Sequence, residues 1–334
     1  MDIIVEIGNS HEGSLGVAKS FVLMAKKSGA RTVKFQMHIA EEEGTPDEPF
    51  RTNFSEQDLT RQDYWRRVNF SEEAWISLAS FCKKEEIEFL CTPLSLKAAT
   101  ILFHNDLVSR WKVGSGNAVD WPLLSFLVES GLPILISTGL ISSSEIKKLK
   151  DFLNENRALE RVTLMHCVSS YPASIEHLDM HLLMNLKNLG FRVGYSDHSG
   201  SIHPSMYAMM LGAQSIEVHM TPRKDYFGPD VSSSLTPEEI ADLVKFAKTF
   251  EVLQSSNGTK EDHFERVLEL RSIFRKGVYW SKDLNKGEIV KHTDLVFLKP
   301  VKGLDVVDYE SILGRVTTRR VKARDAVVWE DLNP

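Results

Sequence analysis

The sequence predicts an α/β protein that consists of a closed (β/α)8 TIM barrel followed by a small, β-rich second domain. Short apolar runs alternate with segments of helical period, and eight such pairs are complete by residue 253. After that residue the pattern changes to short elements separated by turn-forming residues. Eight β-then-α units are what a closed barrel requires, and a doubly wound open sheet is the alternative.

The expected strands are nearly continuous apolar runs, as in Ile134-Leu135-Ile136, which is typical of strands covered on both faces. Amphipathic segments between them predict helices, at residues 15–28, 72–85, 145–154 and 237–253 among others. The eight strands are expected at residues 3–8, 32–37, 88–92, 110–114, 133–138, 161–167, 192–196 and 215–220.

One connection is much longer than the others. Residues 38–70 follow the second expected strand and include an acidic, turn-rich run at residues 41–49. Long loops at the carboxyl end of barrel strands usually cover the binding site, so we expect this connection to do so. A loop that is merely solvated is the alternative.

The chain divides into three parts. Residues 1–253 form the expected barrel, residues 254–275 form a polar linker with a short helix, and residues 276–334 form the second domain. A domain of this size buries little core by itself. We therefore expect it to pack against a barrel, of the same or of another subunit.

The composition excludes several kinds of partner. The net charge is −6, and Lys and Arg are scattered, so we expect neither nucleic acid nor a membrane as partner. No apolar run is long enough to span a bilayer, and no signal-peptide pattern is present. Three cysteines without CxxC spacing fit a reducing compartment, so we expect a cytoplasmic location.

Polar side chains gather where the expected strands end. Such groups are costly to bury in apolar strands unless they have partners, so their concentration at one end predicts a pocket filled by water or ligand. They are Glu6, Lys34 with Gln36, Thr92, Lys112 with Ser115, Ser137 with Thr138, Ser169 with Tyr171, Asp197 with His198, and Glu217 with His219.

His198 and His219 follow neighbouring strands and could converge on one ion. Two imidazoles without cysteine suit a divalent ion that keeps open positions, and manganese, iron, cobalt or zinc would be tolerated. Asp197 could orient an imidazole. Glu217 should point the same way as His219 and is a candidate base. The alternatives are two ordinary strand-end histidines, and a Glu217 that is ion-paired with a lysine.

Lys34 and Lys112 lie within strands, where an ammonium group must reach a carboxylate or an anionic ligand. Together with the hydroxyls of Ser115 and Ser137 they could cradle a phosphate or a carboxylate. A structural ion pair of Lys34 with Glu6 is one alternative, and Schiff-base chemistry is another.

With these residues in place, the sequence resembles the sialic acid synthase family, which includes legionaminate, pseudaminate and spore-coat polysaccharide synthases. The tail resembles the antifreeze-like (SAF) domain that follows the barrel in that family. The resemblance rests on Glu6-Ile7-Gly8 with His11 and Gly13, Val33-Lys34-Phe35-Gln36, Thr92-Pro93, Lys112-Val113-Gly114-Ser115-Gly116, Ser137-Thr138-Gly139, His166-Cys167 with Tyr171-Pro172, Ser196-Asp197-His198, Glu217 with His219, Gly228-Pro229-Asp230 and, in the tail, Lys286-Gly287-Glu288 and Ile312-Leu313-Gly314.

The resemblance implies a transferase that condenses phosphoenolpyruvate with an aldose or N-acyl hexosamine, giving a nonulosonic acid and phosphate for surface or spore-coat polysaccharides. It further implies that His198 and His219 hold a divalent ion of the manganese type, with magnesium or cobalt possible, and that Glu6, Glu217 and Asp197 are the catalytic side chains. A homodimer with exchanged tail domains is implied as well. The expected substrate contacts are Lys34, Gln36, Thr92, Lys112, Ser115, Ser137, Ser169, Tyr171, Ser196, Asp230 and Lys299.

Four positions depart from the family pattern. Ser10 and Ser169 stand where asparagine is usual, Asn117 where glutamate is usual, and Lys299 where an arginine grips the N-acyl group of the sugar. Lysine cannot reproduce the planar fork of arginine. The phosphoenolpyruvate half of the site therefore resembles the family more closely than the acceptor half does. A pyruvate/sugar aldolase and a degenerate sugar-phosphate-binding barrel remain as alternatives.

Overall fold

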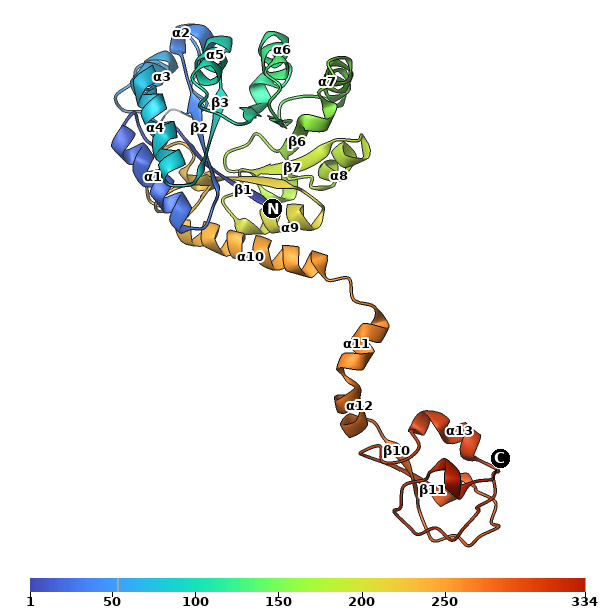
Figure 1. Ribbon diagram of the computed structural model, residues 1–334. Helices are drawn as coiled ribbons and strands as arrows, with labels where there is room; N and C mark the ends of the chain where they lie inside the picture. The colour runs from blue at the N-terminus through green and yellow to red at the C-terminus, as the bar shows by residue number, and fades with distance from the viewer. Residues whose placement is uncertain (53, 334) are drawn as a thin grey trace. The chain divides into compact units, whose positions relative to one another are not determined.

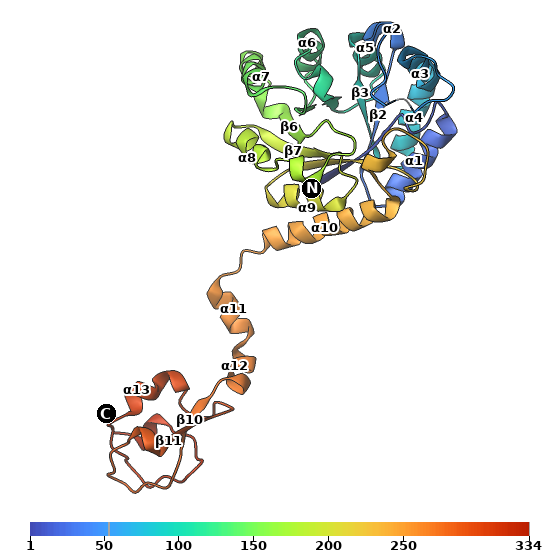
Figure 2. The ribbon, with the colours of Figure 1, turned by 180° about the vertical axis from the view of Figure 1, so that it is seen from behind.

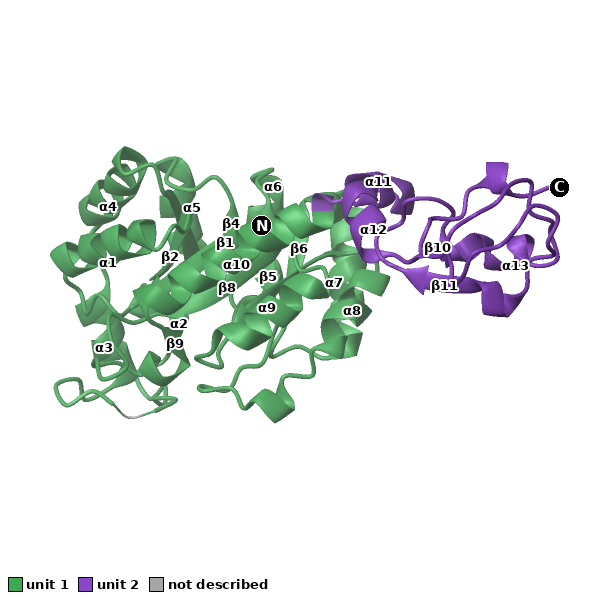
Figure 3. Ribbon diagram, turned by 90° about the horizontal axis from the view of Figure 1, so that it is seen from below, with its two compact units in different colours: residues 1–254 green, residues 255–334 purple. Residues whose placement is uncertain are grey.

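The computed structural model describes residues 1–52 and 54–333, which form two compact units, Met1–Gln254 and Ser255–Pro334 (Figure 3). Each unit has its own buried apolar core. Within the described residues, no helix is both long and apolar enough to cross a membrane.

The first unit is a barrel of eight parallel strands surrounded by helices (Figures 1 and 2), which confirms the predicted fold class. The strands pair in the order β3-β2-β1-β8-β7-β6-β5-β4, and the short β9, Ser234–Leu235, adds to β8. The barrel strands are β1 Asp2–Gly8, β2 Thr32–Met37, β3 Glu88–Pro93, β4 Trp111–Val113, β5 Ile134–Ser137, β6 Val162–Cys167, β7 Arg192–Asp197 and β8 Ser215–Met220.

The barrel has one seam, between β3 and β4, where the described strands form no hydrogen-bonded ladder. At the amino end of this seam the Arg110 side chain, directly before β4, joins three neighbouring strands. Its guanidinium forms ion pairs with Asp2 of β1 and Glu88 of β3, and it donates to the Thr32 hydroxyl of β2 at 3.0 Å. The ion pairs of Arg110 therefore hold β4 to β3 and β1 at the seam, where no backbone ladder joins β3 and β4 among the described strands.

Hydroxyl side chains start many of the outer helices, because they accept the free backbone N–H groups of the first turn. Ser14, Ser71, Ser95 and Ser142 act in this way. The helices of this unit are α1 Leu15–Lys27, α2 Ala40–Glu43, α3 Arg61–Val68, α4 Glu72–Lys84, α5 Leu96–His104, α6 Trp121–Glu129, α7 Ser143–Glu155, α8 His181–Asn188, α9 Ile202–Met210 and α10 Pro237–Ser255.

The connection after β2 is partly helical, which the sequence did not lead us to expect. It contains α2 and α3, and α3 begins with a capping box in which Thr60 and Asp63 satisfy each other's backbone N–H groups. His38 stacks flat on Trp65 of α3, with ring centroids 3.7 Å apart, and so ties the connection to the end of β2.

The lower interior of the barrel is a small apolar plug of Ile4, Leu90, Leu135 and Met165. Met165 occupies the space beside β7 because residue 194 is a glycine, and a Cβ there would lie 2.3 Å from the Met165 sulfur. The plug closes the bottom of the barrel, so that any ligand must approach from the carboxyl ends of the strands.

The second unit contains α11 Lys260–Arg266, α12 Leu268–Phe274 and α13 Tyr309–Ile312, with β10 Gly277–Trp280 paired antiparallel to β11 Leu295–Leu298. Its core includes Val278, Trp280, Val290, Ile312 and Val327. Single 3-10 turns complete the chain, at Ser115–Asn117, Leu159–Arg161, Ile175–His177, Val231–Ser233, His292–Asp294, Val306–Asp308 and Trp329–Asp331.

Candidate active site

A polar layer lies directly above the apolar plug. Side chains two residues apart in a strand point the same way, so the residues that follow the plug residues also face the barrel interior. Ile4 is followed in this sense by Glu6, Leu90 by Thr92, and Leu135 by Ser137. The other strands add Lys34, Lys112, Ser196 and Glu217, all of them buried.

Glu217 stands at the centre of this layer. Its Oε1 lies 3.1 Å from Lys34 Nζ and 3.6 Å from Lys112 Nζ, and it accepts a hydrogen bond from Ser196 Oγ at 2.9 Å. Lys34 Nζ also lies 3.4 Å from Glu6 Oε2. Four charged side chains from β1, β2, β4 and β8 therefore meet in one buried cluster. Two of them, Glu6 and Glu217, lie 211 positions apart in the sequence.

The two lysines differ in their electrostatic state. Burial would lower the pKa of Lys34, but the charges of Glu217 and Glu6 outweigh it and raise the pKa. For Lys112, burial outweighs Glu217 and lowers the pKa. Burial alone would raise the pKa of Glu217, but Lys112 and Lys34 lower it to about 2. Lys112 is thus the cation whose charge is less well compensated by the protein.

Two buried carboxylate oxygens in this cluster have no hydrogen-bond partner within the described residues. They are Oε2 of Glu217 and Oε2 of Glu6, the second of which lies only within ion-pair distance of Lys34. Buried polar groups are normally hydrogen-bonded, and exceptions are expected where a ligand or water belongs. The cluster therefore has the character of a ligand site, rather than of a self-sufficient structural network.

Hydroxyl and amide groups surround the charged cluster. Lys112 Nζ donates to Ser137 Oγ at 2.7 Å, and Lys34 Nζ to Thr92 Oγ1 at 3.4 Å. The Gln36 amide donates to Glu6 Oε1. Ser115 Oγ accepts from the Gly139 N–H at 3.1 Å and lies 3.2 Å from Cys167 Sγ.

His198 and His219 lie side by side at the upper rim, with ring centroids 5.4 Å apart. His198 Nδ1 is 2.8 Å from the Val168 carbonyl oxygen, which can only accept, so Nδ1 carries the hydrogen and Nε2 presents a lone pair. Tyr171 Oη lies 3.1 Å from that Nε2. Burial, followed by the nearby His219, lowers the pKa of His198 to about 3, so the imidazole is neutral at neutral pH.

His198 fits a divalent ion in tautomer and protonation state, because metal-binding imidazoles are neutral and often donate their other N–H to a carbonyl. Asp230 adds a carboxylate whose Oδ2 lies 3.9 Å from His219 Nδ1. Within residues 1–52 and 54–333, no group of three or more His, Cys, Asp or Glu side chains is arranged to hold a metal ion. An ion held by the imidazoles would therefore keep positions for other ligands.

Three of the expected site residues lie elsewhere. Asp197 faces away from the imidazoles: its carboxylate accepts from the Ser199 N–H and from Ser205 Oγ, both at 2.8 Å, so it does not orient His198 as expected. Side chains alternate along β7, and Ser196 takes the inward position. Ser169 packs against Gly139, where a Cβ would lie 2.5 Å from Ser169 Oγ. Lys299 belongs to the second unit, where its ammonium lies over the ring of Phe274.

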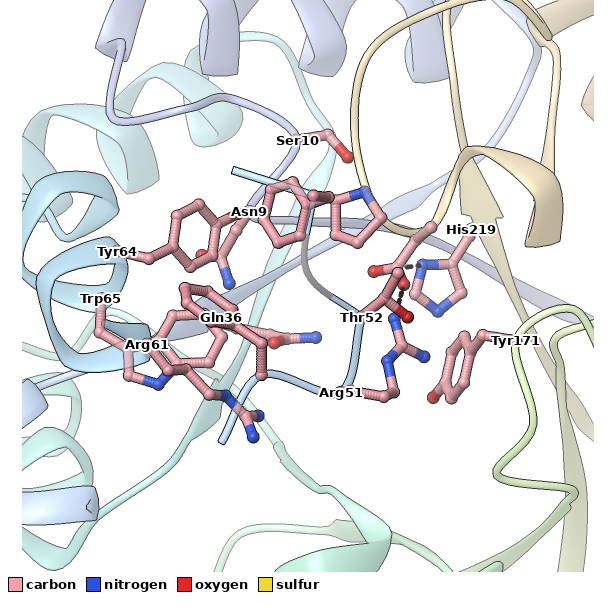
Figure 4. Close-up of a pocket in the computed structure, with 14 residues that line it drawn as sticks. Asn9, Ser10, Gln36, Arg51, Thr52, Arg61, Tyr64, Trp65, Tyr171 and His219 are labelled. Carbon is pink, nitrogen blue, oxygen red and sulfur yellow. Dashed lines mark hydrogen bonds and ion pairs between the residues drawn. The ribbon is translucent and has the colours of Figure 1, made fainter. Parts of the chain in front are cut away.

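A pocket of about 250 Å³ opens above the imidazole end of the site (Figure 4). Gln36, Tyr171, His219 and Asp230 form one part of its wall. The connection after β2 forms the rest, as expected of a covering loop, and contributes Arg51, Thr52, Arg61, Tyr64 and Trp65. The sequence alone did not single out these residues, because only the length of the connection indicated that they approach the site.

Comparison with known proteins identifies the family. The model of the NeuB family matches residues 21–259, and that of the SAF domain matches residues 275–333. The chain belongs to the NeuB family. The N,N'-diacetyllegionaminic acid synthase of Campylobacter jejuni is 31% identical, over 97% of this chain and 98% of that protein. The N-acetylneuraminate-9-phosphate synthase of Drosophila melanogaster is 28% identical, over 94% of this chain and 91% of that protein.

A solved structure agrees with this assignment. The N-acetylneuraminic acid (sialic acid) synthetase of Leptospira borgpetersenii matches with a TM-score of 0.69 and 27% identity, covering 80% of this chain and 90% of that one. The resemblance to sialic acid synthases and the barrel-plus-SAF architecture are thereby confirmed. This NeuB family member is an enzyme, a transferase of the sugar acid synthase type.

Proposed function

We propose that this NeuB family enzyme condenses phosphoenolpyruvate with an aldose or N-acyl hexosamine to give a nonulosonic acid and phosphate. The observation that carries the proposal is the buried cluster of Lys34 and Lys112 around Glu217, two residues before His219 in the same strand. It offers cations for an anionic three-carbon donor, next to the neighbouring imidazole rings of His198 and His219. The names of the relatives support a product of this class.

The donor is expected to lie in the lower part of the site. Lys34 and Lys112, with the hydroxyls of Ser115, Ser137 and Ser196, would hold its phosphate and carboxylate groups. The under-compensated charge of Lys112 suits this role, because an incoming anion would restore its stability. Thr92 lies at the edge of the same cradle, where its hydroxyl accepts from Lys34 Nζ.

In the proposed reaction, C3 of the enol attacks the aldehyde carbon of the acceptor, and positive charge develops at C2 of the donor. The Oε2 atoms of Glu6 and Glu217, neither of which has a hydrogen-bond partner among the described residues, can stabilise this charge and accept a proton from the water that adds to C2. The resulting hemiketal phosphate loses inorganic phosphate by cleavage of its C–O bond, leaving the 2-keto group. The aldehyde oxygen takes up the proton that the added water has given up and becomes a hydroxyl, so the overall reaction consumes one water and releases one phosphate.

We further propose that His198 and His219 hold a divalent ion of the manganese type, which when bound supplies Lewis-acid polarisation of the acceptor carbonyl. Magnesium and cobalt are the alternatives. The remaining acceptor contacts would come from Gln36, Tyr171 and Asp230, which line the pocket next to His219. Lys299 would join them from the tail of a second subunit in a homodimer with exchanged tails, and the enzyme would work in the cytoplasm.

The direct test is a phosphate-release assay with phosphoenolpyruvate, manganese and a panel of aldoses and N-acyl hexosamines. Release that depends on both the acceptor and the ion is expected, with mass spectrometry showing a product that joins all carbon atoms of both substrates. If the panel includes the acceptors of the named relatives and no phosphate appears with any ion, the proposal is wrong.

A pyruvate/sugar aldolase is the second candidate, and the lowered pKa of Lys112 favours it, because Schiff-base lysines must be neutral to attack a carbonyl. Borohydride treatment in the presence of pyruvate separates the two. A covalent adduct on Lys112 would support the aldolase, whereas phosphoenolpyruvate condensation forms no such adduct and releases phosphate.

A further inference from the structure

One guanidinium connects the long connection to both imidazoles. Arg51 lies with its Cζ 3.9 Å from the centroid of the Tyr171 ring and forms an ion pair with Oδ1 of Asp230. Tyr171 in turn contacts His198, and Asp230 lies next to His219. Figure 4 shows the Arg51 guanidinium beside Tyr171 and His219, on the connection that closes the pocket.

In this arrangement, the atoms that would bind a cation, His198 Nε2 and the Asp230 carboxylate, already contact other side chains. The lone pair of His198 Nε2 accepts the Tyr171 hydroxyl hydrogen, since the Val168 carbonyl fixes the hydrogen of the ring on Nδ1. The Tyr171 ring lies along the His198 ring, with centroids 4.1 Å apart, and Arg51 covers the Tyr171 ring as well. The Asp230 carboxylate is taken up by Arg51.

We infer that Arg51 is a positioning residue that competes with the divalent ion. In the closed arrangement it holds Tyr171 on His198 and neutralises Asp230, and binding of the ion displaces Arg51 from both partners. This inference rests on the proposed function, because it takes His198 and His219 as the ligands of the ion.

Three physical effects of Arg51 each weaken the binding of a divalent ion. Its stacking stabilises Tyr171 in the position that blocks Nε2. Its ion pair engages the Asp230 carboxylate, whose other oxygen lies 3.9 Å from His219 Nδ1. Its positive charge, at the pocket wall, repels a second cation. Removing the guanidinium should therefore strengthen ion binding, which is the opposite of what loss of a merely structural contact would do.

The competition also sets an order of binding. When the ion displaces Arg51, this part of the connection loses its contacts with Tyr171 and Asp230 and leaves room for the acceptor, while His38 and Trp65 still hold α3 to the end of β2. The ion should consequently bind before the acceptor, and the freed guanidinium can then pair with an oxygen of the bound sugar.

The test measures Mn²⁺ affinity directly, by the loss of the free-ion EPR signal on titration of the full-length enzyme without substrates. Arg51→Ala should bind Mn²⁺ about three- to tenfold more tightly than wild type. Arg51→Lys keeps the charge but not the planar stack, so its affinity should lie in between. Arg223→Ala is the matched control, because Arg223 is 77% exposed and pairs only with Asp225 nearby.

A double-mutant cycle identifies the route. Tyr171→Phe removes the hydroxyl that occupies Nε2 and should itself tighten binding. In that background Arg51→Ala should have a smaller effect, because only the contribution through Asp230 remains. Equal effects of Arg51→Ala in both backgrounds would show that Arg51 does not act through Tyr171 and would contradict the inference.

Limited trypsin digestion gives a readout independent of affinity. Mn²⁺ should increase cleavage after Arg51 in wild type, scored by mass spectrometry against cleavage after Arg223 as the internal reference. If wild type binds Mn²⁺ and Arg51→Ala binds it equally or more weakly, the inference is wrong while the proposed function stands. If wild type and His198→Ala show the same absence of binding, the proposed ion site itself is wrong.

Discussion

At the scale of single residues, the two imidazoles are held in different ways. His198 is fixed by the Val168 carbonyl and by Tyr171, whereas His219 is placed mainly by its strand, with Asp230 as its charged neighbour. Both are almost completely buried. Loss of either ring should abolish its contribution to ion binding, and it should also cost some stability because a cavity is left behind.

His198→Ala and His219→Ala should each reduce manganese-dependent phosphate release by about 100-fold or more while leaving the circular dichroism spectrum unchanged. His104→Ala, at an exposed position in α5, is the control and should keep full activity. Full activity in both site variants would remove the proposed ion site.

Glu217 also determines how stability depends on acidity. Its pKa falls from 4.5 to about 2 on folding, so the unfolded state binds the proton more readily between these values. The stabilisation by ionised Glu217 is thus complete above pH 4.5 and is lost as the pH falls towards 2.

Glu217→Gln leaves two buried ammonium groups without this partner and should lower the free energy of unfolding by about 3 kcal/mol at pH 7. In urea titrations, the difference from wild type should shrink below pH 4.5, because wild type loses the same charge there. The folded and unfolded states differ in the protonation of Glu217 between about pH 4.5 and pH 2. If the difference in unfolding free energy between Glu217→Gln and wild type stayed constant down to about pH 2.5, the Glu217 charge would not stabilise the fold.

At the scale of elements, Arg110 carries out a task that a strand ladder performs elsewhere in the barrel. Arg110→Met keeps the length of the side chain but removes its ion pairs with Asp2 and Glu88 and its bond to Thr32. Because the side chain is only 17% exposed, the loss should cost about 1 to 3 kcal/mol of stability. Thermal unfolding measures it, with Arg223→Met expected to stay within about 0.5 kcal/mol of wild type.

The barrel strands were predictable because strands buried on both faces are apolar and regularly spaced. All eight were found, with ends that differ by no more than about two residues. The helix α3 was missed, because its sequence RQDYWRRV is polar on average and depends on a capping box and on contacts such as that of Trp65 with His38. Contacts with distant residues are not visible in a local pattern.

The site could be predicted to the extent that strand ends imply it. The alternation of β8 placed Glu217 and His219 on one side of the strand, and the structure agrees. The same rule places Asp197 on the outer side of β7, away from Ser196, which the resemblance alone did not reveal. Arg51 was not predictable, because its partner Asp230 is 179 residues away in the sequence.

At the scale of the whole molecule, the two units have separate cores, and the core of the barrel is much the larger. The second unit exposes several apolar side chains on α11 and α12, namely Phe264, Leu268, Leu270, Ile273 and Phe274. Such a surface is unusual for a chain that works alone. It supports the proposal that the tail packs against a second copy.

Deletion of the residues after Lys276 should raise the KM for the acceptor about tenfold or more, since it removes Lys299, and should shift the enzyme from dimer to monomer. The KM for phosphoenolpyruvate should change little, because its expected contacts all lie in the barrel. Analytical ultracentrifugation and steady-state kinetics provide the two measurements. A truncated enzyme that remains dimeric and fully active would show that the tail has no such role.

The seam between β3 and β4 has a further consequence for motion. Lys112 lies on β4, a three-residue strand whose backbone pairs only with β5 among the described strands. Amide hydrogens along such a free margin exchange with solvent through small local openings. We expect such openings to move Lys112 relative to Lys34, so an anion that contacts both lysines would hold β2 and β4 together across the seam and slow this exchange.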